Sequence, residues 1–331
     1  MTRTETGGLD SARPLRLGTR RSALAWAQSE MVAEAVRTGL GRPVELVPIV
    51  TEGDRSRAHL SQIGGTGVFV SALRDALLAG EIDFAVHSLK DLPTAPAEGL
   101  VLAAVPKRAD VRDVLVCPSG RRLAELGPGD RVGTGSPRRA AQLRALGLGF
   151  EVVPIRGNVD TRIKMAIDGQ VDAVVLARAG LERLDRLDAV TEIIDTDRML
   201  PAPGQGALAV ECRAVPGTRS IHGTLVELLR FVLDDAPSSV AVRAERAFLA
   251  AIEAGCTAPV GALAEVIRPE PGSDGAPAAG DIRLRAVVAT PDGSRILRRE
   301  LTGSAVDPEA LGQRLADELL SAGAHTLMGI R

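Results

Sequence analysis

Short apolar segments alternate with amphipathic helical segments along the first two thirds of the chain, and this alternation limits the possible folds more than any other feature. The predicted strands lie at residues 15–18, 44–50, 82–87, 101–105, 114–116, 131–133, 151–155 and 172–177. The predicted helices between them lie at 22–38, 68–78, 137–146 and 158–167. Such an order is typical of mostly parallel sheets covered by helices, so we expect an α/β fold.

The last third of the chain follows a different order. A predicted helix at 238–254 precedes three predicted strands at 260–267, 282–289 and 295–301, and a helix at 308–322 follows them. This is an α+β pattern, and it indicates a separate third domain.

Length and linkers suggest how these parts are connected. A chain of 331 residues is longer than one hydrophobic core usually holds, so two or three domains are expected. Two polar stretches, 106–112 and 200–206, interrupt the alternation and are predicted to form paired hinge linkers. The expected organisation is a loose tail at 1–14, domain 1 at 15–106 and 207–224, domain 2 at 112–200, and domain 3 at 229–331 with a surface insertion at 268–280.

Charge and cysteine content argue against several classes of protein. The formal net charge is −2, whereas a domain that binds nucleic acid normally has a large basic excess. No stretch is long and apolar enough to span a membrane, and residues 1–14 lack the apolar segment of a signal peptide. Three cysteines are too few for a disulfide framework, and neither they nor the four histidines have metal-site spacing. We therefore expect a cytoplasmic protein without a metal, acting as a monomer.

Three predicted strand-to-helix turns share an arginine-rich design, at residues 18–22, 133–139 and 156–162. Ser22, Ser136 and Asn158 are suitable N-caps, and Pro137 suits the first helical position. Such turns line the ligand crevice of open α/β sheets.

Arg138 and Arg139 fall in the first turn of a predicted helix, where cations are unfavourable by roughly 0.3–1 kcal/mol each. We expect them to repel each other in an empty site, and a bound anion would reverse the sign of this effect. The alternative for any single arginine is a solvated surface position. Because the design occurs three times, we favour a small ligand with several negative charges.

Lys90 and Asp91 follow a predicted buried strand and precede Pro93, which disfavours helix at Leu92. An acid in an arginine-rich crevice could stabilise a developing cation or relay a proton. Spacing alone slightly favours the alternative, a surface ion pair of little consequence.

The three cysteines occupy different kinds of position. Cys117 and Cys212 lie in or beside apolar strands and are predicted to be inert buried thiols. Cys256 follows Gly255, a predicted helix C-cap, and such a connector can expose a thiol for covalent chemistry. On position alone, the alternative, a small residue beneath a loop, is favoured for Cys256.

Taken together, these segments resemble the porphobilinogen deaminase family, in an order and spacing that are highly specific. The family-like stretches are Leu-Gly-Thr-Arg-Arg-Ser at 17–22, Thr-Glu-Gly-Asp at 51–54, Val-His-Ser-Leu-Lys-Asp-Leu-Pro at 86–93, Ser-Pro-Arg-Arg at 136–139, Arg-Gly-Asn-Val-Asp-Thr-Arg at 156–162, Leu-Pro-Ala-Pro-Gly-Gln-Gly at 200–206, and Gly-Cys at 255–256.

The resemblance implies a fold and an activity. The expected fold has two lobes like those of periplasmic binding proteins, with mostly parallel sheets and the active site between them, plus a third α+β domain. The expected enzyme is a hydroxymethylbilane synthase, a transferase of porphyrin and heme (tetrapyrrole) biosynthesis. It joins porphobilinogen units head to tail, releases ammonia at each step and produces the linear tetrapyrrole hydroxymethylbilane.

The resemblance also implies roles for individual residues. Cys256 matches the anchor of a dipyrromethane cofactor held by a thioether, and Asp91 matches a catalytic carboxylate that also contacts this cofactor. The positions that match binding of the cofactor's acetate and propionate groups are Lys90, Ser136, Arg138 and Arg139. The positions that match contacts to the substrate or the growing chain are Arg20, Ser22, Arg156, Arg162 and Arg183.

Some positions depart from the family pattern. Gln62 and Thr66 stand where many members have lysines, in a loop that we expect to act as a lid, and Gly135 stands where serine is common. The main rival interpretation is a non-catalytic binding protein for a small polycarboxylate, which would not need Cys256 or Asp91. A second rival is a regulatory protein that binds a tetrapyrrole precursor.

Overall fold

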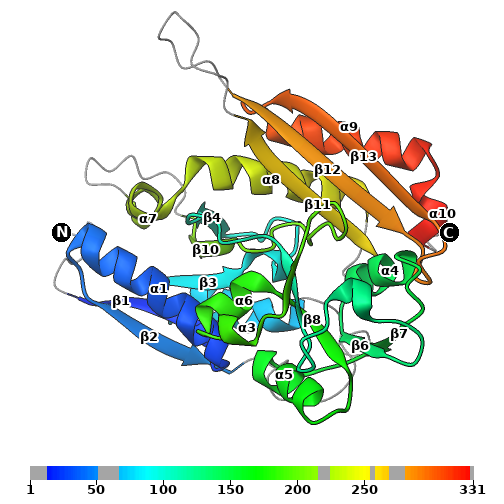
Figure 1. Ribbon diagram of the computed structural model, residues 1–331. Helices are drawn as coiled ribbons and strands as arrows, with labels where there is room; N and C mark the ends of the chain where they lie inside the picture. Colours follow the sequence, from blue (N-terminus) through cyan, green and yellow to red (C-terminus); the bar gives the residue numbers. More distant parts are fainter. Residues whose placement is uncertain (1–12, 51–66, 215–223, 254–257, 268–279, 329–331) are drawn as a thin grey trace, which may run out of the picture. The chain divides into compact units, whose positions relative to one another are not determined.

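The computed structural model describes residues 13–50, 67–214, 224–253, 258–267 and 280–328. Figure 1 labels the helices and strands of the chain, which divides into two compact units. Unit 1 comprises Met1–His87, Asp91–Lys107 and Leu208–Asp235. Unit 2 comprises Ser88–Lys90, Arg108–Ala207 and Ala236–Arg331. Both predicted linkers therefore fall almost entirely within unit 2.

Unit 1 is built on a five-stranded sheet of order β2-β1-β3-β10-β4. Its elements are β1 (Leu15–Arg20), α1 (Ala23–Leu40), β2 (Val44–Ile49), α3 (Gly67–Leu78), β3 (Phe84–Ser88), β4 (Leu100–Ala104), β10 (Leu208–Arg213) and α7 (Leu225–Leu233). Strand β1 is parallel to β2 and β3, and β10 is antiparallel to β4. Because side chains alternate along a strand, Leu15 and Leu17 point to one face, where they pack in one core with Val36 of α1 and Leu229 of α7.

Unit 2 contains a second five-stranded sheet, of order β7-β6-β8-β5-β9. Its elements are β5 (Asp113–Val116), β6 (Arg131–Thr134), α4 (Pro137–Ala145), β7 (Glu151–Pro154), α5 (Val159–Ile167), β8 (Ala173–Ala177), α6 (Arg178–Arg183) and β9 (Glu192–Ile194). Strands β7, β6 and β8 are parallel neighbours, while β5 runs antiparallel to β8 and β9. One face packs against Leu143 of α4, and the other against Ile163 of α5 and Leu181 of α6.

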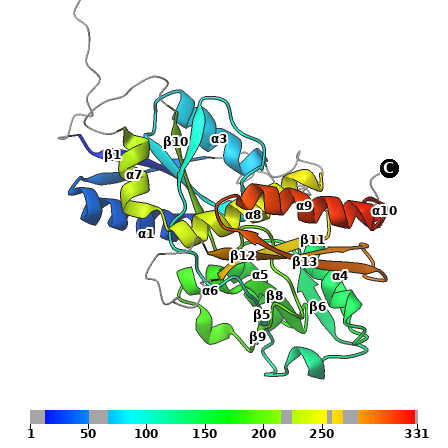
Figure 2. The same ribbon diagram turned by 90° about the horizontal axis from the view of Figure 1, so that it is seen from above.

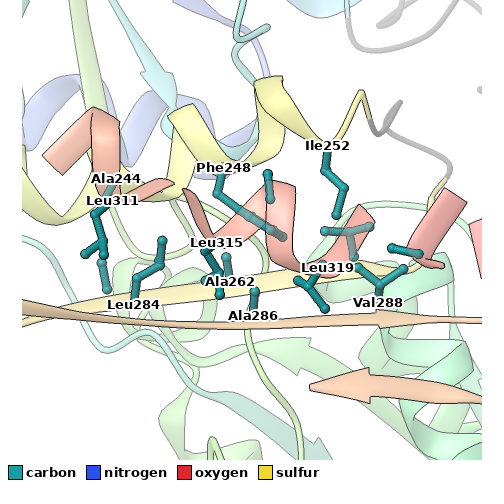
Figure 3. Close-up of a cluster of buried hydrophobic side chains, with 14 of the residues drawn as sticks. Ala244, Phe248, Ile252, Ala262, Leu284, Ala286, Val288, Leu311, Leu315 and Leu319 are labelled. Atoms are coloured by element: carbon teal, nitrogen blue, oxygen red, sulfur yellow. The ribbon is translucent and has the colours of Figure 1, made fainter. Parts of the chain in front are cut away.

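Unit 2 also contains a three-stranded antiparallel sheet of order β11-β12-β13. Its elements are α8 (Ala236–Ala251), β11 (Val260–Ile267), β12 (Asp281–Ala289), β13 (Ile296–Ser304), α9 (Pro308–Ser321) and α10 (Ala324–Met328). Helices α8 and α9 cover one face (Figures 1 and 2), where Phe248, Leu315 and Leu284 share one core (Figure 3). On the opposite face, Leu263 and Val287 pack with Leu200 of the second linker.

The α/β order of the first two thirds and the α+β order of the last third are both confirmed. The predicted helix start at 22 is also confirmed, because Ser22 is the N-cap of α1. Among the α-helices and β-strands of the described residues, α6, β9, α7 and α10 had no counterpart in the sequence prediction.

Candidate active site

Arginine-rich turns follow three neighbouring parallel strands of unit 2. Strand β6 leads into Ser136–Arg139, β7 leads into Arg156–Arg162, and β8 leads into α6, which ends at Arg183. The carboxyl ends of parallel strands meet at one edge of a sheet, where open α/β folds bind ligands. The structure therefore brings these predicted site residues to a common edge.

The predicted helix caps at this edge are confirmed. The Ser136 hydroxyl accepts a hydrogen bond from the Arg139 backbone N–H at 3.4 Å, and Pro137 occupies the first helical turn. Asn158 accepts from the Thr161 backbone N–H at 2.9 Å. Capping uses a serine oxygen only as an acceptor, so the Ser136 hydroxyl still has a proton to donate to an anion.

Arg138 and Arg139 are buried rather than exposed, with 4% and 5% of their surface accessible. The expected repulsion between them is relieved by Asp113, the first residue of β5. Asp113 Oδ2 lies 2.9 Å from Arg138 Nη1, and Asp113 Oδ1 lies 2.8 Å from Arg139 Nη2. The sequence alone did not identify Asp113 as the counterion that partly offsets this repulsion.

The charges of this cluster depend on one another. Burial alone would raise the pKa of Asp113, but Arg138 and Arg139 outweigh burial and hold that pKa well below its usual range. Burial lowers the pKa of Arg138 despite the nearby carboxylate. Asp113 thus stays ionised and compensates one of the two positive charges.

The other arginines at this edge hold nearby backbone. Arg162 Nε donates to the Gly157 carbonyl at 2.8 Å, and Arg183 Nη2 donates to the Gly206 carbonyl at 2.7 Å. Burial lowers the pKa of Arg183. Arg156 is exposed. The guanidinium groups of Arg162 and Arg183 are therefore anchored in place.

The second linker of unit 2 passes beside Lys90. The Leu89 backbone N–H donates to the Ala207 carbonyl at 3.0 Å. Gly204 has φ +73°, and a Cβ placed there would lie 2.2 Å from Leu89 Cδ2 and 3.2 Å from the Lys90 backbone nitrogen. Glycine is therefore required at 204 both for its backbone conformation and for the close approach of the Leu89–Lys90 backbone.

Unit 1 places its own predicted site residues at one sheet edge. Strands β1 and β3 are parallel neighbours, and at their carboxyl ends Arg20 is the last residue of β1, Ser22 follows it, and Asp91 lies beyond β3. Ser22 accepts from the Ala25 backbone N–H at 3.3 Å. Asp91 is the last residue of a 3₁₀ turn, η1 (Leu89–Asp91), and is half-buried.

A buried cluster behind this edge was missing from the sequence analysis. Glu211 of β10 lies 2.8 Å from Arg74 Nη2 and 3.1 Å from His87 Nε2, at the end of β3. Burial alone would raise the pKa of Glu211, but the adjacent His87 and Arg74 side chains lower it to about 2. Charged residues inside apolar strand segments, such as Glu211 in β10 and Asp113 at the start of β5, are the signal that could have identified both clusters.

The cysteines agree with their predicted roles where the structure describes them. Cys117 and Cys212 are buried, and burial raises the pKa of Cys212 to about 11. Cys256 lies outside the described residues, as do Gln62, Thr66, the 51–54 motif and most of the 268–280 insertion.

Among the residues that the structure describes, no group of three or more His, Cys, Asp or Glu side chains is placed to hold a metal ion. The described helices include none with the length and apolar character needed to cross a membrane.

Comparisons with known proteins identify the family of the chain. The model of the porphobilinogen deaminase dipyrromethane cofactor binding domain matches residues 15–218, and the model of the porphobilinogen deaminase C-terminal domain matches residues 239–321. The chain is 57% identical to porphobilinogen deaminase 1 of Streptomyces coelicolor, over 96% of this chain and 98% of that protein. It is 54% identical to porphobilinogen deaminase of Thermobifida fusca, over 96% and 97% of the two chains.

A solved structure of the Bordetella pertussis BvgS VFT2 domain matches with a TM-score of 0.40 and 17% identity, covering 65% of this chain and 86% of that domain. The family models and the two relatives span nearly the whole chain, and the chain belongs to the porphobilinogen deaminase family.

Proposed function

We propose that the chain joins porphobilinogen units head to tail, releases one ammonia per unit and produces hydroxymethylbilane. The observation that carries this proposal is the arginine-rich edge of unit 2, where three adjacent strand ends supply cationic side chains. Each porphobilinogen carries two carboxylates, so the substrate and the growing product need several such groups. The type of reaction is inferred from the chain's membership of the porphobilinogen deaminase family.

The residues of this edge fit a dipyrromethane. Arg138 is almost fully buried, yet its Nε has no hydrogen-bond partner among the described residues. An unsatisfied buried donor is costly, and a carboxylate would satisfy it. We propose that Arg138, Arg139, Ser136 and Lys90 hold the acetate and propionate groups of the cofactor, and that Cys256 anchors it by a thioether. When bound, the cofactor supplies the pyrrole carbon on which the chain grows.

We propose that Asp91 is the catalytic residue. Loss of ammonia leaves positive charge on the substrate, and a fixed carboxylate lowers the free energy of that charged state. The same oxygen atoms can accept a pyrrole N–H or relay a proton. The 3₁₀ turn holds the Asp91 backbone in position, and its first residue, Leu89, is buried.

We propose that the remaining arginines bind the substrate and the growing chain, together with Ser22. The hydrogen bonds of Arg162 and Arg183 to backbone carbonyls favour a fixed orientation for each guanidinium group. Fixed donors lose little entropy when a carboxylate binds. The set is Arg20, Ser22, Arg156, Arg162 and Arg183.

A non-catalytic binding protein is disfavoured because the family match extends beyond the sheets that such a protein needs, to residues 239–321. We further propose that the protein acts as a cytoplasmic monomer on a small molecule, without nucleic acid. We propose three domains, predicted from the sequence at 15–106 with 207–224, 112–200, and 229–331, with the start of the third moved to residue 236 because Leu229 and Leu233 of α7 pack in the core of unit 1.

An assay of the purified chain with porphobilinogen tests the activity. The proposal expects one ammonia per porphobilinogen consumed, together with a linear tetrapyrrole that cyclises without further enzyme. A binding protein would deplete free porphobilinogen only up to its own concentration and release no ammonia. That outcome would overturn the proposed function.

A further inference from the structure

Asp113 makes direct contacts with three buried side chains of unit 2. It has no accessible surface, and Arg138, Arg139 and Gln205 are each at most 5% exposed. Its Oδ1 accepts from Arg139 Nε at 3.0 Å and from Gln205 Nε2 at 2.8 Å, in addition to the Arg139 Nη2 contact described above. Three donors thus converge on one oxygen, while Arg138 meets the other.

Gln205 fixes this arrangement to both linkers. Its Nε2 also donates to the Val111 carbonyl at 2.7 Å, in the first linker. Gln205 itself belongs to the second linker, and Arg138 Nη1 donates to the Leu200 carbonyl of that same linker at 2.6 Å. The Asp113 carboxylate is therefore held between the two linkers and the first turn of α4.

Arg138 and Arg139 differ in whether all their guanidinium nitrogens have hydrogen-bond partners among the described residues. In Arg139, Nε and Nη2 donate to Asp113, and Nη1 donates to the Val175 carbonyl at 3.1 Å. In Arg138, Nη1 is engaged, but Nε has no partner among the described residues. Arg139 is thus braced at every nitrogen, whereas Arg138 retains a buried donor.

The charge of the cluster is also unbalanced. Asp113 provides one negative charge for two guanidinium groups, and the charged groups that act on Arg138 are Asp113 and Arg139. A buried cluster with one excess positive charge favours binding of one anionic group.

We propose that Asp113 is a positioning residue: it sets the geometry and the net charge of the Arg138–Arg139 pair, so that the pair accepts one carboxylate of the bound pyrrole chain through Arg138. This inference rests on the proposed function. It assigns the direct contact with the carboxylate to Arg138, and it narrows the cofactor-holding role proposed above for Arg139 to keeping Asp113 in place beside Arg138.

The test compares Asp113→Asn with Asp83→Asn. Asp83 is a buried carboxylate of unit 1 that pairs with Arg16 at 3.0 Å, so its loss reproduces the general effect of breaking a buried ion pair. For each full-length variant, intact mass gives the fraction of chains that carry a covalent dipyrrole, and urea unfolding gives the stability. We expect Asp113→Asn to lower that fraction about tenfold or more, and Asp83→Asn to leave it within about twofold.

Equal dipyrrole occupancy in the two variants would overturn the proposal. If Asp113→Asn does not fold, Asp113→Glu keeps the charge but moves the carboxylate by one methylene. The proposal then expects reduced occupancy in a folded chain, and unchanged occupancy would overturn it. If the unmodified chain carries no dipyrrole and releases no ammonia, the proposed function fails instead, so the two failures can be told apart.

Discussion

Arg108 and Glu245 form a buried ion pair within unit 2, in which Nη1 and Nη2 of the arginine lie 2.6 and 3.0 Å from the two carboxylate oxygens. Glu245 has no accessible surface. It also accepts from the backbone N–H groups of Gly204 and Ala264, at 2.6 and 2.8 Å. One carboxylate of α8 therefore joins the first linker, the second linker and strand β11.

Glu245→Gln should destabilise the protein strongly, because it leaves Arg108 buried without a counterion. Breaking one partner of a buried pair typically costs about 3–5 kcal/mol in the free energy of unfolding, which urea denaturation measures. The matched control is Glu309→Gln, which breaks the exposed pair between Arg243 of α8 and Glu309 of α9 and should cost about 1 kcal/mol or less. Equal losses in the two variants would show that the Glu245 pair does not stabilise unit 2.

The Glu211 cluster predicts a dependence of stability on pH. The pKa of Glu211 in the folded chain is about 2, below its ordinary value of 4.5. Ionised Glu211 therefore stabilises the folded chain fully at pH values above 4.5, and this stabilisation is lost as the pH falls toward 2. At its full size, the contribution of ionised Glu211 to the free energy of unfolding is on the order of 3 kcal/mol. Glu211→Gln should therefore be less stable than the unmodified chain at neutral pH, and this difference should shrink as the pH is lowered below 4.5.

Urea midpoints of both chains, taken at a series of pH values, measure this difference. Glu265→Gln serves as the control because it removes an exposed partner of Arg283. A difference for Glu211→Gln that stayed constant or widened toward acid pH would contradict the assignment.

Gly204→Ala should impair turnover more than stability alone explains. The added methyl group would collide with Leu89 and press on the Lys90 backbone, immediately before Asp91. Gly41→Ala is the matched control, since Gly41 also has a positive φ of 62° but a Cβ there meets nothing within 4 Å. We expect both variants to lose about 1 kcal/mol of stability through backbone strain, and only Gly204→Ala to lose turnover. Normal turnover in Gly204→Ala would show that the 200–206 linker does not affect catalysis.

The sequence predicts much of the fold because its strands and helices are strongly periodic, and the N-caps Ser22, Ser136 and Asn158 are encoded locally. Two of the three arginine-rich turns, 133–139 and 156–162, lie at one edge of the unit 2 sheet because parallel strands end at a common edge, while the turn at 18–22 belongs to unit 1. The sequence does not reveal which charges pair across the fold. Asp113 meets Arg138 and Arg139 across 25 and 26 positions, and Arg108 meets Glu245 across 137. Such contacts depend on tertiary packing, as does helix α7, which packs on α1 rather than with the last third of the chain.

Asp91→Asn should lower turnover while leaving substrate affinity largely unchanged. The substitution nearly preserves shape but removes the negative charge, and only interactions that strengthen in the transition state accelerate the reaction. The expected loss is on the order of a hundredfold or more. Single-turnover addition of the first pyrrole to preformed holoenzyme measures it, with Asp75→Asn, an exposed acid of α3, as the control. A rate near that of the unmodified enzyme would show that Asp91 is only a surface partner of Lys90.

The most direct test of the whole account is the intact mass of the purified chain beside that of Cys256→Ser. The account predicts a fixed mass excess of one dipyrrole on the unmodified chain, the same excess on Cys117→Ser and Cys212→Ser, and none on Cys256→Ser. Both alternative thiols are buried, so neither should substitute as an anchor. An unmodified chain without the excess, or a Cys256→Ser variant that retains it, would contradict the account.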